Sequence, residues 1–356
     1  MVSTPSEVLA RHRRERGAVT DAATAAVLGL WRMVDVDALD ESWDALAPQM
    51  AAAVSSAQVM AARQADQYLQ AVDRIQPSGI TAQLAHESFA GVTLAGREVA
   101  PEMYSAVTHT KTLIGQGVAR RDAFQAGAAF IATLVGAMVQ DIGRQADMTI
   151  STAKGYSTYV RVVSPGACSR CAILAGRDDY SKPFLRHPRC RCQMWPIKGA
   201  AADRMGPIPD ELASSPEEYF AKLSPAEQDR IFTKAGAEAI RAGADPIQVV
   251  NARRGYLGSN PPGVNVRRLR PIQIGVRPDG SPLEVYATAE GTTIRGVFGR
   301  REFNATAEAI RDGRYRRTTT LRLMPEQIVR MAGGNQERLR ELLYRYGYLW
   351  RMPTRS

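Results

Sequence analysis

The sequence has few aromatic residues and only four cysteines, and both scarcities narrow the class of fold. Aromatic side chains make up 7% of the 356 residues, whereas apolar residues reach 45% and alanine is abundant. This balance can bury a core, so it argues against global disorder, and it favours long, closely packed helices over a β-sandwich. The length predicts two or three domains, or one domain with long extensions.

Sequence signatures of common enzymes and of targeting segments are also lacking. The chain has no Gly-x4-Gly-Lys-Ser/Thr loop, no dinucleotide glycine fingerprint, no HExxH motif and no Gly-x-Ser-x-Gly elbow. The basic run at 11–16 is not followed by an apolar region with a cleavage site, so it does not predict a secretory signal. The longest apolar run, 126–139, is shorter than the roughly 20 residues that span a bilayer. We expect a buried helix there and no stable membrane insertion, with insertion as the alternative.

All four cysteines lie within one stretch of 25 residues, together with one of the four histidines. Cys168 and Cys171 form a Cys-x2-Cys pair, which places two sulfurs on one turn. Cys190 and Cys192 follow, with His187 three positions before them. Structural zinc prefers four Cys or His ligands in a tetrahedron. The five residues therefore predict a structural zinc site, whose fourth ligand is either His187 or Cys192.

Two alternatives to zinc stay open for this motif. The thiols can be free or disulfide-linked structural cysteines in a compact cap, although cysteines confined to one motif suit a reducing compartment. Cys190 and His187 can also be combined into a nucleophile pair, but a sulfur bound to a metal is poorly placed to attack a substrate. We therefore assign no catalytic residue.

The same stretch resembles the head-morphogenesis signature of MuF-like minor capsid proteins of tailed bacteriophages. The resemblance rests on Cys-Ser-Arg-Cys at 168–171, Leu-Ala-Gly-Arg at 174–177 and Arg-His-Pro-Arg-Cys-Arg-Cys at 186–192. Two downstream blocks, 244–255 and 322–328, are similar to the version found in phages of actinobacteria. The resemblance implies a virion protein, present in few copies in the capsid interior or at the portal vertex, and in the host cytoplasm during assembly.

The partners implied by this resemblance are the portal, the major capsid protein and the packaged DNA. A structural role in head assembly or genome delivery follows, and no enzymatic activity is expected. Relatives in actinobacterial phages are also labelled capsid maturation proteases, so cleavage of scaffold or capsid protein is the alternative. No Ser/His pairing in the sequence makes such an activity visible.

The net charge of +10 is concentrated in the C-terminal third. Residues 251–356 hold 20 arginines, no lysine and 9 acidic residues, while residues 1–250 are nearly neutral. Arginine suits contacts with phosphate or carboxylate groups, so this region predicts non-specific DNA binding or an acidic protein partner, with a solvated basic surface as the alternative. The candidate residues are Arg253, Arg254, Arg267, Arg268, Arg270, Arg300, Arg301, Arg316 and Arg317.

Helix-start and turn signals predict a mainly α protein in three parts. Residues 1–198 would form a MuF-like helical domain with the Cys/His knot at 162–196 as a small irregular, zinc-knuckle-like cap. A linker at 199–213 would lead to a basic region at 214–356 with helices and a possible β-hairpin.

Single elements follow from the same signals. The predicted helices start at a cap formed by residues 20–21, at Pro48 (running to 75), at 120 (to 145), after Ser215, after Ser224 (to 242), and at 246, 325 and 336. A short strand is predicted within 156–163, and a hairpin around Pro278-Asp279-Gly280.

Overall fold

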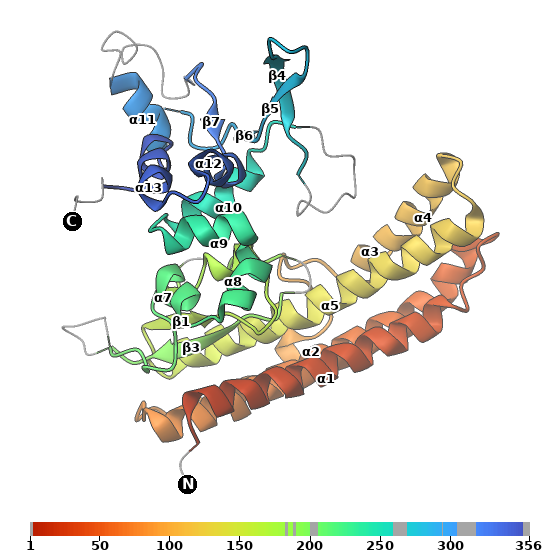
Figure 1. Cartoon of the computed structure of the whole chain (residues 1–356). Helices are drawn as coiled ribbons and strands as arrows, with labels where there is room; N and C mark the ends of the chain where they lie inside the picture. Colours follow the sequence, from red (N-terminus) through yellow and green to blue (C-terminus); the bar gives the residue numbers. More distant parts are fainter. Residues whose placement is uncertain are drawn as a thin grey trace. The chain divides into compact units, whose positions relative to one another are not determined.

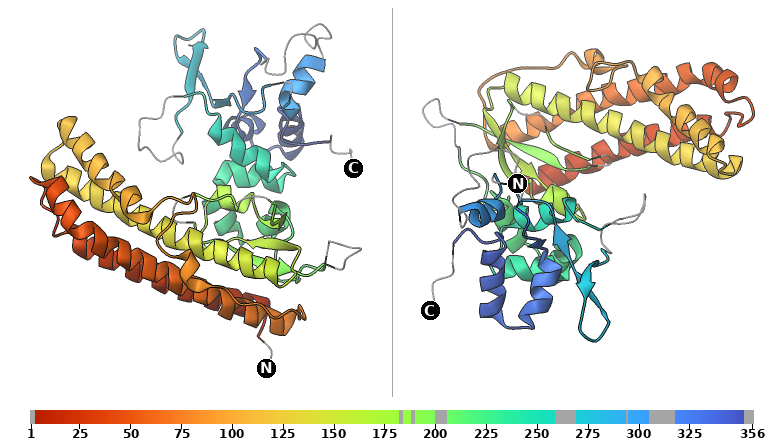
Figure 2. Two further views of the ribbon diagram at one scale, coloured as in Figure 1. Left: turned by 180° about the vertical axis from the view of Figure 1, so that it is seen from behind. Right: turned by 90° about the horizontal axis from the view of Figure 1, so that it is seen from above.

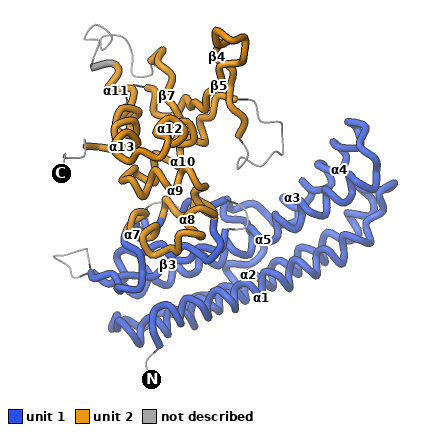
Figure 3. The backbone as a smooth tube through the Cα atoms, in the orientation of Figure 1, with its two compact units in different colours: residues 1–167, 175–214 blue, residues 168–174, 215–356 orange. Residues whose placement is uncertain are grey.

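The computed structural model describes residues 3–181, 184–187, 190–199, 206–258, 269–293, 295–304 and 318–351. These residues are mainly helical with small antiparallel sheets, which confirms the predicted fold class (Figure 1). The chain forms two compact units (Figure 3). The first comprises residues 1–167 and 175–214, and the second comprises residues 168–174 and 215–356.

The first unit is built on three long helices that pack along one another (Figures 1 and 2). The 37 residues of one of them, α2, make a rod of roughly 55 Å at 1.5 Å per residue. The predicted strand within 156–163 is confirmed as the central strand of a three-stranded sheet, β1. The elements are α1 (Pro5–Trp31), α2 (Leu39–Ile75), the 3-10 helix η1 (His86–Phe89), α3 (Val99–Met103), α4 (Ser105–Gly115), α5 (Arg120–Ala153), β1 (Thr158–Val162), β2 (Gly176–Asp179) and β3 (Gln193–Ile197).

The helix start predicted at residues 20–21 is wrong, because α1 begins earlier, after Thr4. The Thr4 hydroxyl accepts a hydrogen bond from the Glu7 backbone N–H at 3.2 Å, and the Glu7 carboxylate accepts one from the Thr4 N–H at 2.8 Å. This capping box satisfies two backbone donors at the helix end. Thr20 lies inside α1, where its hydroxyl donates to the Arg16 carbonyl at 2.8 Å.

Helix α2 also begins earlier than predicted. The sequence places Pro48 in its first turn, whereas α2 starts at Leu39 and continues through the proline. A proline inside a helix leaves the carbonyl four residues earlier, here that of Asp44, without its N–H donor. Both residues are exposed, so water can satisfy this carbonyl. The helix therefore continues, with Leu46 and Met50 buried on its other side.

The core of the first unit lies along the long helices in two apolar clusters. One surrounds Trp31 and Trp43, and the other joins Leu69 of α2 and Ile150 of α5 to Trp195 of β3. Burial of each such side chain stabilises the fold by roughly 1.5–3 kcal/mol. The second cluster thereby packs the small sheet against the helices.

A buried polar group connects α1 to α5, and it was not among the predictions made from the sequence. Nε2 of His12 lies 3.2 Å from one carboxylate oxygen of Asp147, and Arg16 donates to the other at 3.1 Å. Burial lowers the pKa of His12 more than the Asp147 carboxylate raises it, so the ring is neutral near neutral pH. Burial raises the pKa of Asp147, but Arg16 and His12 outweigh that effect and the net shift is downward. The carboxylate is therefore charged, and Arg16 neutralises it.

In its described residues, the second unit has short helices and two two-stranded sheets around its own core. Ser215 and Ser224 cap helices as predicted, and the predicted hairpin is present as β4–β5. The short segment 168–174 contributes α6 to this unit. The elements are α6 (Ser169–Ala172), α7 (Pro216–Ala221), α8 (Pro225–Phe232), α9 (Lys234–Arg241), α10 (Pro246–Arg254), β4 (Ile272–Val276), β5 (Pro282–Val285), β6 (Ala287–Thr288), α11 (Val297–Asn304), β7 (Arg322–Leu323), α12 (Pro325–Ala332) and α13 (Gln336–Arg345).

One helix of this unit is shorter than predicted. The helix expected from Ser224 to Ala242 ends at Phe232, and a second helix follows Thr233. Thr233 has a φ of 68°, a left-handed conformation that breaks the helix, and its hydroxyl accepts the N–H of Gly236 at 3.3 Å. The break lets Phe232 and Ile240, on separate helices, enter the same core.

We predict that Gly127→Ala destabilises the protein although alanine is the better helix former. A Cβ at Gly127 would lie against the Thr110 hydroxyl and 2.8 Å from Cζ2 of Trp31. Overpacking of this kind costs about 1–3 kcal/mol. Gly29→Ala in α1 is the matched control, because a Cβ there meets nothing within 4 Å. The control should raise the free energy of unfolding by about 0.5–1 kcal/mol. Chemical denaturation measures both variants, and a stabilising Gly127→Ala would contradict this packing.

Candidate metal centre

The three-stranded sheet brings the two halves of the cysteine motif to one end. The strand order is β2-β1-β3, and both pairings are antiparallel. Val162, at the end of β1, pairs with Gln193, at the start of β3. The first cysteine pair follows β1, and Cys192 directly precedes β3. Both pairs therefore lie next to the same end of β1.

The ligand atoms of the motif form two overlapping groups. Those of Cys168, Cys171 and His187 lie within 4.8 Å of one another, and so do those of Cys171, Cys190 and Cys192. Cys168 and His187 are half-buried, while the other three residues are buried. All five predicted ligands are thus brought together, and Cys171 belongs to both groups.

These side chains fit a zinc ion in both chemistry and spacing. The four cysteines, all of which lie in the described part of the chain, are not joined by disulfide bonds in this structure. A Zn–S bond of about 2.3 Å implies sulfur–sulfur distances of roughly 3.8 Å in a tetrahedron. The spacing within 4.8 Å allows that geometry after small side-chain movements. Soft thiolates with an imidazole are the donor set that zinc prefers.

Arginine and aspartate side chains hold the segment that carries the second cysteine pair. Arg144 of α5 donates to the Cys190 carbonyl at 3.0 Å and to the Asp141 carboxylate at 2.8 Å. Arg186 forms an ion pair with the same carboxylate. Asp141 and Arg144 are both buried. They therefore fix this segment to α5 from inside the protein.

Two further arginines place positive charge next to the cysteine sulfurs. The buried guanidinium of Arg161 lies 3.9 Å from the Cys190 sulfur and 4.1 Å from the centre of the Phe184 ring. Arg13 lies close enough to Cys192 to interact with it electrostatically; burial lowers the pKa of Arg13, and the Cys192 charge opposes this shift. Nearby positive charge favours thiolates, the form that binds metal. It also offsets the negative charge of several thiolates at one ion.

Where the structure describes them, the predicted arginines of the second unit fall into two groups, those bound to other groups of the fold and those exposed to solvent. Arg253 is ion-paired with Glu326, and Arg301 donates to the carbonyl groups of Leu349, at 2.8 Å, and Trp350. These two support the fold. The other predicted residues that the structure describes, Arg254, Arg270 and Arg300, are exposed. Arg267, Arg268, Arg316 and Arg317 lie outside the described residues.

The supporting residues around the motif were missed by sequence reasoning. Asp141 and Arg144 are distant in sequence from the cysteines, and Arg161, although it lies shortly before Cys168, belongs to no ligand-spacing pattern. On α1, His12 and Arg16 occupy positions of the buried face that also carries Val8. Polar residues at such apolar positions were a recognisable signal of a buried network.

Comparisons with known proteins give one match. The family model described as VG15 protein matches residues 3–219, which include the three long helices and the whole cysteine motif. No curated protein and no solved structure matches the chain. The match confirms the predicted relationship to bacteriophage virion proteins, without separating MuF-like proteins from others. Because the matched region covers well over half of the 356 residues, this chain belongs to the VG15 family of phage virion-associated proteins.

Proposed function

We propose that this protein is a MuF-like minor capsid protein that acts in head morphogenesis near the portal. The observation that carries the proposal is the family match, which spans both the helical bundle and the cysteine motif. The motif also has the Cys-x2-Cys and His-Pro-x-Cys-x-Cys order of MuF-like proteins. A long bundle with a cap at one end suits a protein that docks to a larger assembly.

The exposed face of α5 supports docking to the portal or the major capsid protein. This helix contains an apolar 18-residue window that is only 33% buried. By length and composition α5 can also cross a membrane, but core helices of soluble proteins pass the same test. Its other face packs in the core through Ile131 and Val135, near Trp31. We therefore propose that a protein surface covers the exposed face, and not a stable membrane insertion.

A structural role without catalysis suits the surroundings of the buried histidine. A protease of the Ser–His type needs a nucleophile hydrogen-bonded to the histidine ring. In the described part of the chain, Nε2 of His12 faces Asp147 while Nδ1 has no hydrogen-bond partner. This arrangement supports a structural residue.

We predict that the protein is found at a single vertex of the mature head and binds the cognate portal protein. Gold-labelled antibody on opened virions, and co-purification with the portal, measure both properties. Incubation with the cognate scaffold and capsid proteins should leave them intact. Labelling over the whole shell, or site-specific cleavage of the scaffold, would contradict the proposed role.

The cysteine motif is proposed to hold one structural zinc ion. When bound, zinc supplies folding free energy to a segment too small to have a core of its own. The thiols of Cys168, Cys171 and Cys190 are the first three proposed ligands, and His187 or Cys192 is the fourth. Arg161 and Arg13 would hold the sulfurs in the thiolate form.

We predict about one zinc per chain in protein purified without chelator. Cys171→Ser should remove most of the metal, because Cys171 is the residue common to both ligand groups. His109→Gln is the control, since His109 stacks on Phe130 away from the motif and should leave the zinc content unchanged. Elemental analysis measures the metal. A metal-free native protein whose four thiols all react freely would refute the zinc proposal.

The fourth ligand can be identified by two further variants. His187→Gln and Cys192→Ser each remove one of the competing donors. The true ligand is the one whose loss lowers the zinc content, and the spare residue is the one whose loss does not.

The exposed arginines of the second unit are proposed to contact the packaged DNA. Arg254, Arg270 and Arg300 can each reach a phosphate, and such contacts are independent of sequence. We predict that replacing all three by glutamine weakens binding to duplexes of unrelated sequence equally. The slope of log affinity against log salt should become shallower by about 0.9 for each arginine that neutralises a phosphate.

A charge-matched control tests whether DNA binding depends on the positions of these three arginines or only on the net charge of the protein. Arg14, Arg32 and Arg121 are exposed arginines of the first unit, and replacing them by glutamine removes the same charge. This control should retain nearly full DNA binding in a filter-binding assay across a salt series. Equal losses in the two triple variants would show that the second unit holds no particular DNA site. Binding to the portal without any DNA binding at low salt would assign these arginines to a protein interface.

A further inference from the structure

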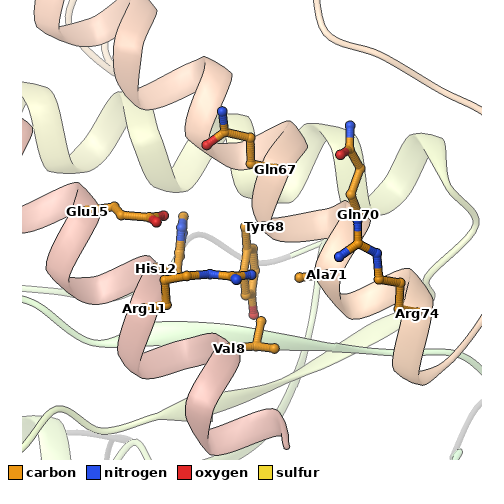
Figure 4. A pocket seen from close by; sticks show the side chains of 9 residues that line it. All are labelled: Val8, Arg11, His12, Glu15, Gln67, Tyr68, Gln70, Ala71 and Arg74. Carbon is orange, nitrogen blue, oxygen red and sulfur yellow. The ribbon is translucent and has the colours of Figure 1, made fainter. Parts of the chain in front are cut away.

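A cavity of about 250 Å³ lies between the beginning of α1 and the end of α2 (Figure 4). The two helices are joined by a short connection and run antiparallel, so residues near 11 and near 74 become neighbours. The side chains that matter for its chemistry are Arg11, His12, Glu15, Gln67, Gln70 and Arg74. None of them belongs to the cysteine motif or to the basic second unit.

The cavity offers unpaired hydrogen-bond donors to a ligand. Arg11 and Arg74 are exposed and extend from the two facing helices into the space between them (Figure 4). Among the described residues, neither guanidinium forms an ion pair or a hydrogen bond. The exposed amides of Gln67 and Gln70 add neutral donors. Guanidinium groups bind phosphate and carboxylate oxygens through paired hydrogen bonds, so this donor set fits an oxyanion.

The aromatic rings at the floor of the cavity cannot bind a nucleotide base by stacking. His12 and Tyr68 stack on each other with ring centres 4.1 Å apart, and both are buried. Their faces are therefore not available to a nucleotide base. A ligand would therefore be held by its charged group, and the volume of about 250 Å³ has room for a phosphate group with a substituent attached.

Glu15 adds a negative charge to this cavity. Its carboxylate lines the same cavity beside His12 (Figure 4). It would repel a carboxylate, a sulfate or a phosphodiester, because those ions bring negative charge without a hydrogen to donate. Hydrogen phosphate and a protonated phosphate monoester keep a P–OH group, which can donate a hydrogen bond to Glu15. For a ligand with a P–OH group, the Glu15 carboxylate is therefore a hydrogen-bond acceptor, whereas for the other oxyanions it is only a repulsive charge.

We propose that this cavity binds a protonated phosphate group, as inorganic phosphate or as a monoester, through Arg11 and Arg74, with Glu15 accepting the P–OH hydrogen. The binding is a property of the first unit alone and does not depend on DNA. The two sources differ in their pH dependence. A monoester loses its last proton above a pKa of about 6, whereas inorganic phosphate keeps a P–OH group at neutral pH.

The test is calorimetric titration of the full chain with inorganic phosphate, sulfate, a simple monoester and a simple diester at constant ionic strength. We expect one saturable site for phosphate, and binding at least about tenfold weaker for sulfate and for the diester. The monoester should bind below a pH of about 6 and release above it. Arg11→Gln and Arg74→Gln should each weaken phosphate binding about tenfold or more. Arg14→Gln, on an exposed position of the same helix, should leave it unchanged.

Glu15→Gln is the decisive variant, because it removes the repulsive charge but keeps the size of the side chain. It should bring sulfate affinity to within about threefold of phosphate affinity. Circular dichroism checks that each variant is folded, and these surface changes between good helix formers should be tolerated. The proposal is overturned by absent phosphate binding, by equal phosphate and sulfate affinity in the unaltered chain, or by binding that survives both arginine variants. In the last case the ion sits elsewhere, such as on the arginines of the second unit.

Discussion

Helix α5 carries two buried carboxylates, and the first unit depends on the ion pairs that they form. Asp147 accepts a hydrogen bond from Arg16 and lies beside His12, which connects α5 to α1. Asp141, nearly two turns earlier, accepts from Arg144 and Arg186, which connects α5 to the segment of the second cysteine pair. The same helix therefore holds the bundle together and positions half of the candidate metal centre.

Burying these carboxylates removes them from water, which costs free energy. The structure compensates by giving each carboxylate more than one partner. Removing one member of a buried ion pair typically costs about 3–5 kcal/mol, because the other charge is left without compensation. Asp141 has two arginines, and Arg144 divides its donors between Asp141 and the Cys190 carbonyl. These contacts hold the segment in one position. A fixed position is what a set of metal ligands needs, even where buried charges do not maximise stability.

Other arginines of this protein differ in their surroundings. Arg161 and Arg13 lie beside cysteine sulfurs and favour thiolates, while Arg253 and Arg301 bind groups inside the second unit. Arg11 and Arg74 stay exposed on the two facing helices of the first unit. The amino-acid composition gives only the total positive charge of all these arginines. Burial and partners decide which arginines are free to meet phosphate.

The sequence by itself determined the features that depend on local chemistry. The Cys and His spacing identified all five residues that come together at the candidate metal centre, and the Ser-Pro-x-Glu signals identified the starts of α7 and α8. Turn and cap residues also predicted the β4–β5 hairpin and α12 correctly, and the alternation of residues within 156–163 predicted β1. These signals act within a few residues, so neighbouring positions suffice to read them.

The tertiary structure decided what depends on distant partners. Solvation of the exposed turn at Pro48 lets α2 continue, and a shared core makes the chain break at Thr233. No spacing rule joins Asp141 to Arg186, or Arg11 to Arg74, because only the packing of the folded chain brings them together. The ligands of the candidate site could be predicted because they lie in one short stretch. Their supporting charges could not. Asp141 and Arg144 come from α5, which is remote in sequence, and Arg161 of β1 meets the Cys190 sulfur only in the folded protein.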